Sequence, residues 1–308
     1  MLGEFDLIDR YFRDAAARRD DVLLGVGDDG ALLRPKAGFD LVMVTDTLVE
    51  GTHFKSSASP RSIGHRALAV NLSDLAAMGA TPAWGLLALT LPATDEPWIK
   101  EFAVGFLELA RQHDLALVGG DTTRGPLSVT VQLVGYVPQG RGLRRSGAQV
   151  GDVVLMSGTL GDAAAGLHDS NDYLRQRFDY PTPRIALGES LLDVASAAMD
   201  VSDGLLADLA KLTAASGAGA TLSIDSLPLS NELVAVKGLD GARRLALTGG
   251  DDYELLFTLP PAALASLQGE LARGEITVIG ALASGAGLWL MAQGVPQPAT
   301  PGGFDHFG

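Results

Sequence analysis

The chain has 308 residues and carries 23 lysines and arginines against 37 aspartates and glutamates, a formal net charge of -14. Such an acidic protein is a poor partner for nucleic acid or an anionic membrane, because both require a basic binding face. The sequence has no cysteine, which excludes disulfides, thiolate metal sites and cysteine nucleophiles. No apolar run approaches the ~18 residues of a membrane span, and the N-terminal MLGEFDLIDR does not resemble a signal peptide. We therefore expect a cytoplasmic protein.

The first half of the sequence alternates helix-like and strand-like segments. Phe5, Ile8 and Phe12 are spaced by three and four residues, which predicts an N-terminal helix. Pro60 and Gly79 mark the expected start and end of a long helix. The expected elements are a helix over 3–19, a strand over 41–47, a helix over 60–78, a strand over 84–91, a helix over 95–112, and strands over 115–120 and 127–137.

A glycine- and arginine-rich segment, PQGRGLRRSGAQVGD, occupies residues 138–152 and indicates a boundary between an N-terminal domain, 1–148, and a C-terminal domain, 149–308. A second alternating series follows, so we expect an α/β (α+β) architecture in both halves. The polar segment His168–Pro183 is expected to be a surface excursion. The expected elements are strands over 153–157, 220–225, 254–259 and 275–282, and helices over 161–169, 184–197, 203–216 and 261–273, before a Gly/Pro-rich tail.

A literal GxGxxG occurs at Gly25, Gly27 and Gly30, but its surroundings argue against a dinucleotide site. The ALLRPKAGFD that follows contains a proline and has no helical period, so no helix N-terminus would receive a pyrophosphate. Asp28 and Asp29 also place negative charge where phosphates would lie, which requires a cation between them. The sequence lacks GxxxxGK[ST], so a P-loop is excluded.

Acidic residues recur at the ends of strands, in turns and beside glycine. They are Asp28, Asp29, Asp46, Asp74, Asp121, Asp200, Asp203, Asp251 and Asp252. Carboxylates in such loops bind Mg2+, with water and substrate phosphates completing its coordination. The alternative is ordinary turn chemistry, and for Asp203 it is capping of the following helix. Asp74 lies one turn before a helix end, where the helix dipole disfavours a carboxylate unless a cation is bound.

Eight motifs, taken in order, resemble the thiamine-monophosphate kinase family of the aminoimidazole ribonucleotide synthetase-like superfamily. They are GVGDDGALL, VTDTLVEGTHF, NLSDLAAMGATP, GGDTTRGPLSVT, SGTLGDAAAGL, MDVSDGLLADL, GGDDYELLFT and GGFDHF, and they span nearly the whole chain. The resemblance implies an N-terminal α/β domain that binds ATP and Mg2+ and pairs across a dimer axis, and a C-terminal α/β domain that completes the active site. It also implies a homodimer that binds ATP without a P-loop.

The resemblance assigns roles to particular positions. The implied ligands of several Mg2+ ions are Asp29, Thr45, Asp46, Asp74, Asp121, Asp200, Asp203 and the backbone carbonyl of Val44. The implied ATP-binding residues are Gly120, Asp121, Arg145 and Ser202. The implied substrate-binding residues are His53, Asp251 and Phe304. Relatives often carry glutamate in place of Asp251, and tyrosine or tryptophan in place of Phe304.

The implied activity is ATP-dependent phosphorylation of thiamine monophosphate to thiamine diphosphate by in-line transfer of the γ-phosphoryl group. Magnesium would neutralise the two polyanionic substrates. The acceptor is a phosphate already ionised near pH 7, so no general base is expected. Two alternatives remain at this point. One is another ATP-dependent enzyme of the superfamily, such as aminoimidazole ribonucleotide synthetase. The other is a non-catalytic, metal-dependent nucleotide-binding protein.

Overall fold

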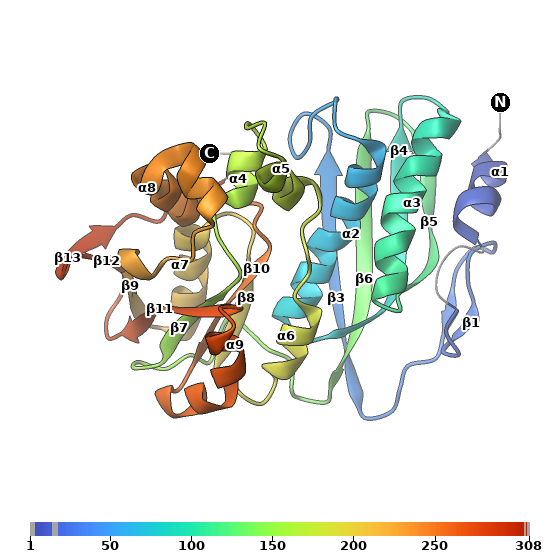
Figure 1. The fold of residues 1–308 in the computed structure, drawn as a ribbon. Coiled ribbons are helices and arrows are strands. Elements are labelled where there is room, and N and C mark those ends of the chain that lie inside the picture. The colour runs from blue at the N-terminus through green and yellow to red at the C-terminus, as the bar shows by residue number, and fades with distance from the viewer. Residues whose placement is uncertain (1–3, 14–17, 305, 307–308) are drawn as a thin grey trace. The chain divides into compact units, whose positions relative to one another are not determined.

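The computed structural model describes residues 4–13, 18–304 and 306 (Figure 1). The chain divides into two compact units. The first comprises the described part of residues 1–75 together with 80–142, and the second comprises 76–79 and 143–308. The division after Gly142 lies within the glycine- and arginine-rich segment and before the expected boundary at residue 148.

The first unit is built on a four-stranded mixed sheet in the order β3-β6-β4-β5. The pairs β3·β6 and β6·β4 are antiparallel, whereas β4·β5 is parallel and is joined through α3. A separate antiparallel pair, β1·β2, precedes the sheet in sequence. The elements are α1 (Glu4–Ile8), the π-helical η1 (Asp9–Arg13), β1 (Val22–Leu24), β2 (Leu32–Leu33), β3 (Phe39–Val49), α2 (Pro60–Ala77), β4 (Thr81–Leu91), α3 (Glu96–Gln112), β5 (Ala116–Arg124) and β6 (Ser128–Pro138).

One face of this sheet is covered by α2 and α3, which lie along it in Figure 1. The ion pair between Arg61 and Glu108, 2.6 Å long, joins the two helices. Alternate residues of β6 point to this face and are fully buried, as Val131 and Leu133 show. The intervening residues, such as Gln132, are only half-buried. The sheet therefore has a helix-covered face and an opposite face, here called the open face.

The second unit contains a seven-stranded sheet in the order β13-β12-β9-β11-β7-β10-β8. The pair β12·β9 is parallel, and the other pairings within this sheet are antiparallel. The strands are β7 (Val153–Ser157), β8 (Ala197–Val201), β9 (Gly219–Ser223), β10 (Glu254–Leu259), β11 (Ile276–Ala283), β12 (Leu288–Ala292) and β13 (Val295–Ala299).

Helices of the second unit supply two hydrophobic clusters. The larger includes Leu205 and Leu209 of α7 together with Met156 and Leu256 of the sheet. The smaller joins α4, α5 and α8. The helices are α4 (Asp162–Gly166), α5 (Asp172–Asp179), α6 (Ile185–Ser190), α7 (Leu205–Ser216), η2 (Ile224–Ser226), α8 (Asn231–Thr248), η3 (Pro261–Leu267) and α9 (Gln268–Ala272).

Several sequence expectations for the second unit are wrong. The segment His168–Pro183 is not merely a polar excursion, because it contains α5, whose Leu174 and Phe178 are buried. The helix expected over 184–197 ends at Ser190, and β8 begins at the last of its residues. Helix α8, which is kinked at Gly238, was not expected, and neither was the β12–β13 hairpin in the tail.

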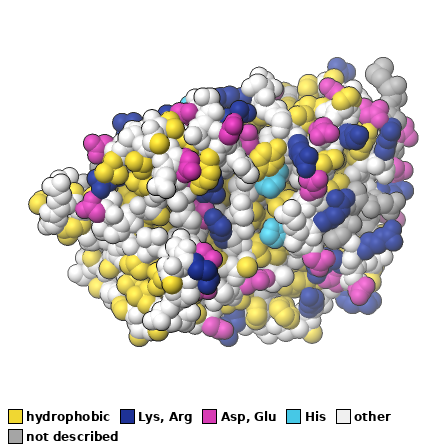
Figure 2. Space-filling model, in the orientation of Figure 1, with side chains coloured by type: hydrophobic (Ala, Val, Ile, Leu, Met, Phe, Trp, Pro, Cys, Tyr) yellow, Lys and Arg dark blue, Asp and Glu magenta, His cyan; other side chains and the backbone are white. Residues whose placement is uncertain are grey.

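In the first unit the expected N-terminal helix is divided into α1 and η1, and residues 14–17 lie outside the described part. Among the described residues, no helix is both long and apolar enough to cross a membrane. On the face drawn in Figure 2, lysine and arginine side chains are interspersed with aspartate and glutamate.

Replacing Leu174 by alanine should lower the free energy of unfolding by about 2–5 kcal/mol, because the side chain is fully buried between α4, α5 and α8. Chemical denaturation measures this change. Tyr173→Ala is the matched control on the same helix, since Tyr173 is exposed, and its cost should be about 0.5 kcal/mol or less. Equal, small effects at both positions would mean that α5 does not pack.

Candidate functional site

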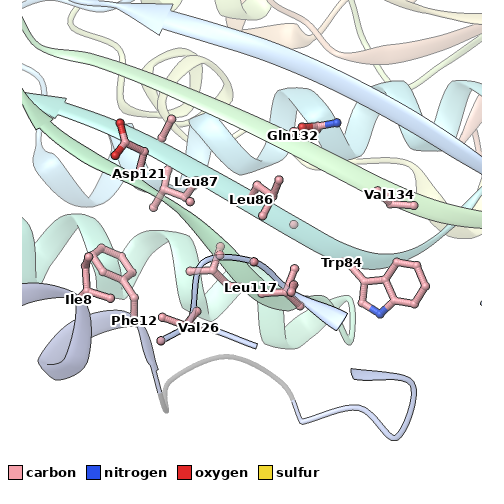
Figure 3. A pocket seen from close by; sticks show the side chains of 18 of the residues that line it. Ile8, Phe12, Val26, Trp84, Leu86, Leu87, Leu117, Asp121, Gln132 and Val134 are labelled. Atoms are coloured by element: carbon pink, nitrogen blue, oxygen red, sulfur yellow. The ribbon is translucent and has the colours of Figure 1, made fainter. Parts of the chain in front are cut away.

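A cavity of about 950 Å³ lies on the open face of the sheet in the first unit. In Figure 3, Ile8 and Phe12 lie on one side of this cavity, and Asp121, Leu86 and Gln132 lie on the other. The cavity is lined both by apolar side chains and by side chains that carry oxygen atoms. The predicted site residues that line it are Asp29, Thr45, Gly120 and Asp121.

Gly120 sets the position of the Asp121 carboxylate. Its φ of +154° brings the backbone of β5 so close to β4 that a Cβ atom would lie 1.8 Å from the carbonyl oxygen of Leu87. Any side chain at this position would therefore clash with the neighbouring strand. Asp121 follows directly and pairs in register with Ala88. The GGD sequence thus places a carboxylate at the edge of the cavity.

The loop containing Asp28 and Asp29 lines the same cavity. Asp28 Oδ1 accepts a hydrogen bond of 2.8 Å from the backbone N–H of Asp29, which is the turn chemistry that the sequence offered as an alternative. Strand β2 follows the loop, so no helix begins there. The rejection of GxGxxG as a dinucleotide site agrees with this geometry.

The residues predicted from VTDT do not all face the cavity. Thr45 lines it, and its hydroxyl donates to the carbonyl oxygen of Val131 at 3.1 Å. Val44 and Asp46 alternate with Thr45 along β3, so their side chains point to the helix-covered face. Asp74 is half-buried near the end of α2. Within the described parts of the chain, no three acidic or histidine side chains form a cluster that could hold a metal.

His53 lies in the turn that follows β3. Its Nδ1 accepts a hydrogen bond of 3.0 Å from the backbone N–H of Val49. In a neutral imidazole the proton is therefore on Nε2. This contact holds the ring in place and, in the neutral form, fixes its tautomer.

In the second unit, the structure brings together predicted residues from three separate motifs. Asp200 is buried near the end of β8, and Ser202 and Asp203 follow the strand. The backbone N–H of Asp251 donates to the carbonyl oxygen of Ser202 at 2.8 Å, and that of Phe304 donates to the carbonyl oxygen of Asp203 at 3.0 Å. Phe304 therefore lies beside the VSDG turn.

Arg145 is exposed in the same unit. Its carbonyl oxygen accepts a hydrogen bond of 2.9 Å from Ser216 at the end of α7, which anchors the backbone there. The backbone of residues 202–204, by contrast, is fixed by a single residue, Asp208, near the start of that helix.

Asp208, which the sequence reasoning missed, holds the turn that carries Ser202 and Asp203. Its side chain is fully buried, and Oδ2 accepts hydrogen bonds from the backbone N–H groups of Ser202, Asp203 and Gly204 at 3.0, 2.9 and 3.2 Å. Burial raises the pKa of Asp208, and the ion pair with Lys211 opposes this rise. The available signal was an acidic residue in the first turn of the predicted helix.

Lys211 was also missed. Its ammonium group lies 2.5 Å from Asp203 Oδ2 and 2.8 Å from Asp208 Oδ1. The helix itself begins after Gly204, and no side chain caps it. Asp203 is therefore not the helix cap that the sequence left open, and its carboxylate is held by Lys211 instead.

Two further buried acids support the GGDDYEL segment. Asp252 accepts hydrogen bonds from the backbone N–H groups of Gly161, at 2.7 Å, and Ala163, at 3.2 Å. Glu254 is fully buried and binds Arg177 at 2.8 Å and Arg184 at 2.6 Å. Burial raises the pKa of Asp252 to about 8, although the two backbone donors and Arg177 oppose the rise.

Asp252→Asn should change how stability depends on pH. The folded protein retains a proton at Asp252 up to about pH 8, whereas the unfolded chain releases it near pH 3.8. The contribution of this group to the free energy of unfolding is therefore complete below pH 3.8 and falls as the pH rises to about 8. Urea denaturation at pH 5 and pH 8 should show a larger fall for the wild type than for Asp252→Asn.

The matched control for this experiment is Asp240→Asn, which removes one exposed carboxylate from the same unit. This variant should follow the wild-type profile. If Asp252→Asn and the wild type lost stability in parallel between pH 5 and pH 8, Asp252 would not be protonated in the folded state.

Comparison with known proteins identifies the family. Residues 27–137 match the family described as AIR synthase related protein, N-terminal domain. The thiamine-monophosphate kinase of Salmonella typhimurium is 47% identical over 99% of this chain and 98% of its own. The crystal structure of the Stenotrophomonas maltophilia thiamine-monophosphate kinase is 49% identical, with a TM-score of 0.87 over 96% of this chain and 98% of that one.

A third comparison adds a complex with ligands. The solved structure of AaThiL complexed with AMPPCP and TMP is 34% identical, with a TM-score of 0.80 over 99% of this chain and 97% of that one. These similarities extend over both units and nearly the full length of the sequence. The chain therefore belongs to the thiamine-monophosphate kinase family.

Proposed function

We propose that this protein transfers the γ-phosphoryl group of ATP to thiamine monophosphate, forming thiamine diphosphate and ADP. The observation that carries the proposal is full-length similarity to thiamine-monophosphate kinases, one of them solved with AMPPCP and TMP. AMPPCP has the phosphate chain of ATP, with a methylene group between the last two phosphorus atoms. A protein that binds such a pair holds a phosphoryl donor and its acceptor together.

The predicted metal ligands are chemically suited to Mg2+, because every donor atom is an oxygen. Carboxylates come from both units, and Thr45 and the carbonyl group of Val44 add neutral oxygens. No three acidic side chains converge among the described residues, so water and phosphate oxygens would complete the coordination. Bound Mg2+ would neutralise the β- and γ-phosphates. The proposed ligands are Asp29, Val44, Thr45, Asp46, Asp74, Asp121, Asp200 and Asp203.

The remaining residues bind and orient the two substrates. Gly120, Asp121, Arg145 and Ser202 are the proposed ATP-binding residues. The Arg145 guanidinium would donate to a phosphate. His53 is a proposed substrate-binding residue, and the Val49 N–H that donates to its Nδ1 holds its ring in place. The acceptor phosphate is ionised near pH 7, so no residue of this chain acts as a general base.

The thiazolium ring of the second substrate carries a positive charge and an aromatic face. Asp251 offers a carboxylate to that charge, and Phe304 offers a ring for stacking. Their backbones are held at neighbouring residues of one turn, Ser202 and Asp203. This common anchor is the feature of the structure that supports their joint assignment to substrate.

The decisive experiment measures ATP consumption that depends on thiamine monophosphate, with thiamine diphosphate identified as the product. Asp121→Asn should lower kcat by about 100-fold or more, because one charge that gathers cations at the phosphates is lost. Its free energy of unfolding in EDTA should be close to that of the wild type, since Asp121 is exposed.

Two results would contradict the proposal. Turnover with formylglycinamidine ribotide in place of thiamine monophosphate would indicate an aminoimidazole ribonucleotide synthetase. Binding of ATP without turnover of either compound would indicate a non-catalytic nucleotide-binding protein. If Asp121→Asn unfolded in EDTA under conditions where the wild type stays folded, Asp121 would have a structural role.

We also propose a cytoplasmic homodimer that forms through the open face of the first unit. That face exposes large apolar side chains: Leu41 is 43% exposed, Met43 62% and Leu86 39%. Large exposed apolar side chains of this kind are typical of protein interfaces, and a self-complementary face produces a two-fold dimer. The face and the cavity share Met43 and Leu86, so a second copy would also border the cavity.

Light scattering should give twice the mass of one chain for the wild type and one chain mass for Met43→Glu, because a buried unpaired charge would oppose pairing. Trp289→Glu is the control, since it places the same charge at a similarly exposed apolar residue of the second unit. A monomeric wild type, or a Met43→Glu variant that remains dimeric, would contradict this interface.

A further inference from the structure

The turn that carries Asp251 has an unusual backbone. Asp251 has a φ of +71° and Tyr253 a φ of +51°, so both residues adopt the left-handed conformation without being glycine. Side chains make this conformation unfavourable, and it persists only where surrounding contacts impose it. Residues in strained conformations of this kind are concentrated at functional sites.

Contacts on both sides of the turn hold this shape. The backbone N–H groups of Asp251 and Tyr253 donate to the carbonyl oxygens of Ser202 and Val201 at 2.8 and 2.9 Å. A Cβ atom on the preceding Gly250 would lie 2.4 Å from the carbonyl oxygen of Ser202, so only glycine allows the approach. The turn is therefore pressed against the end of β8.

Asp252 anchors the turn from the opposite direction. Its buried carboxyl group accepts hydrogen bonds from the backbone of Gly161 and Ala163 at the start of α4. The side chain of Asp252, which lies between Asp251 and Tyr253, thus points into the protein. The next acid, Glu254, is bound by Arg177 and Arg184, which fixes the chain where it enters β10.

The shape of the turn brings the side chains of Asp251 and Tyr253 into contact. The Tyr253 hydroxyl donates to Asp251 Oδ1 at 3.2 Å. Tyr253 is only 9% exposed, so its ring is held by packing. A hydroxyl on a fixed ring limits the rotation of the carboxylate that it binds.

We propose that Tyr253 is a positioning residue for the second substrate: its hydroxyl holds the Asp251 carboxylate in the orientation that meets the thiazolium cation. The inference rests on the proposed function, which assigns Asp251 to that substrate. It adds a residue that acts through Asp251 and takes no part in phosphoryl transfer. The strained turn and the buried Asp252 are what bring the hydroxyl and the carboxylate together.

The test is a double-mutant cycle of Tyr253→Phe and Asp251→Ala. Tyr253→Phe removes only the hydroxyl, so it should raise KM for thiamine monophosphate about five- to tenfold. KM for ATP and the free energy of unfolding should change little. In the Asp251→Ala background the same change should have no further effect, because the group that it orients is gone. Tyr173→Phe on α5 is the matched control, because Tyr173 is exposed, and it should behave as the wild type.

The possible failures are distinguishable. Tyr253→Phe effects of equal size with and without Asp251 would overturn the positioning role, as would an equal rise of KM for both substrates. An unchanged KM in Asp251→Ala would overturn both assignments at this turn while leaving the kinase activity intact. Absence of thiamine diphosphate formation by the wild type would instead be the failure of the proposed function.

Discussion

The arrangement of the candidate site in the second unit depends on buried carboxyl groups that accept hydrogen bonds from backbone N–H groups. Asp208 binds the 202–204 turn in this way, and Asp252 binds the start of α4. A carboxyl group removed from water needs such donors, and the turn needs acceptors for N–H groups that no strand or helix satisfies. Ser202 and Asp251 therefore stand on backbone whose position is set by residues that a ligand need not contact.

The basic side chains of the second unit also serve to position its acidic residues. Arg177 and Arg184 bind Glu254, and Lys211 binds Asp203 and Asp208. These basic side chains neutralise the protein's own acids within the second unit. Two polyanionic substrates would then depend on other cations for most of their neutralisation, as the proposed Mg2+ ions provide.

The sequence predicted the elements with regular apolar periodicity. Strand β7 has the expected bounds, and α2 ends one residue before its expected end. Helix α5 was missed because only Leu174 and Phe178 mark its buried side, and α8 because Gly238 interrupts it. Strand β8 was missed because its short apolar run resembles the preceding helix. Periodicity cannot separate these cases without knowledge of the packing partner.

For the candidate site, too, the sequence predicted one group of residues and missed another. Motifs containing glycine and aspartate supplied the predicted ligand-binding residues, because close backbone approach and carboxylates are both visible in a sequence. The supporting contacts were not visible. The bond between Gly161 and Asp252 joins residues 91 apart in sequence, and the role of Asp208 depends on how the preceding turn folds back onto its helix. Long-range hydrogen bonds of this kind follow from the fold, so sequence patterns alone cannot predict them.

The prolines of β13 affect whether other protein molecules can add a strand to the edge of the seven-stranded sheet. This strand forms one edge of the seven-stranded sheet, and Pro296 and Pro298 occupy alternate positions in it. Its pairing with β12 is continuous, so the N–H groups that these prolines lack are the ones that would point away from the sheet. An incoming strand would find carbonyl groups there without the matching donors. This edge therefore resists the addition of further strands, which protects the folded protein from growing into sheet-like aggregates.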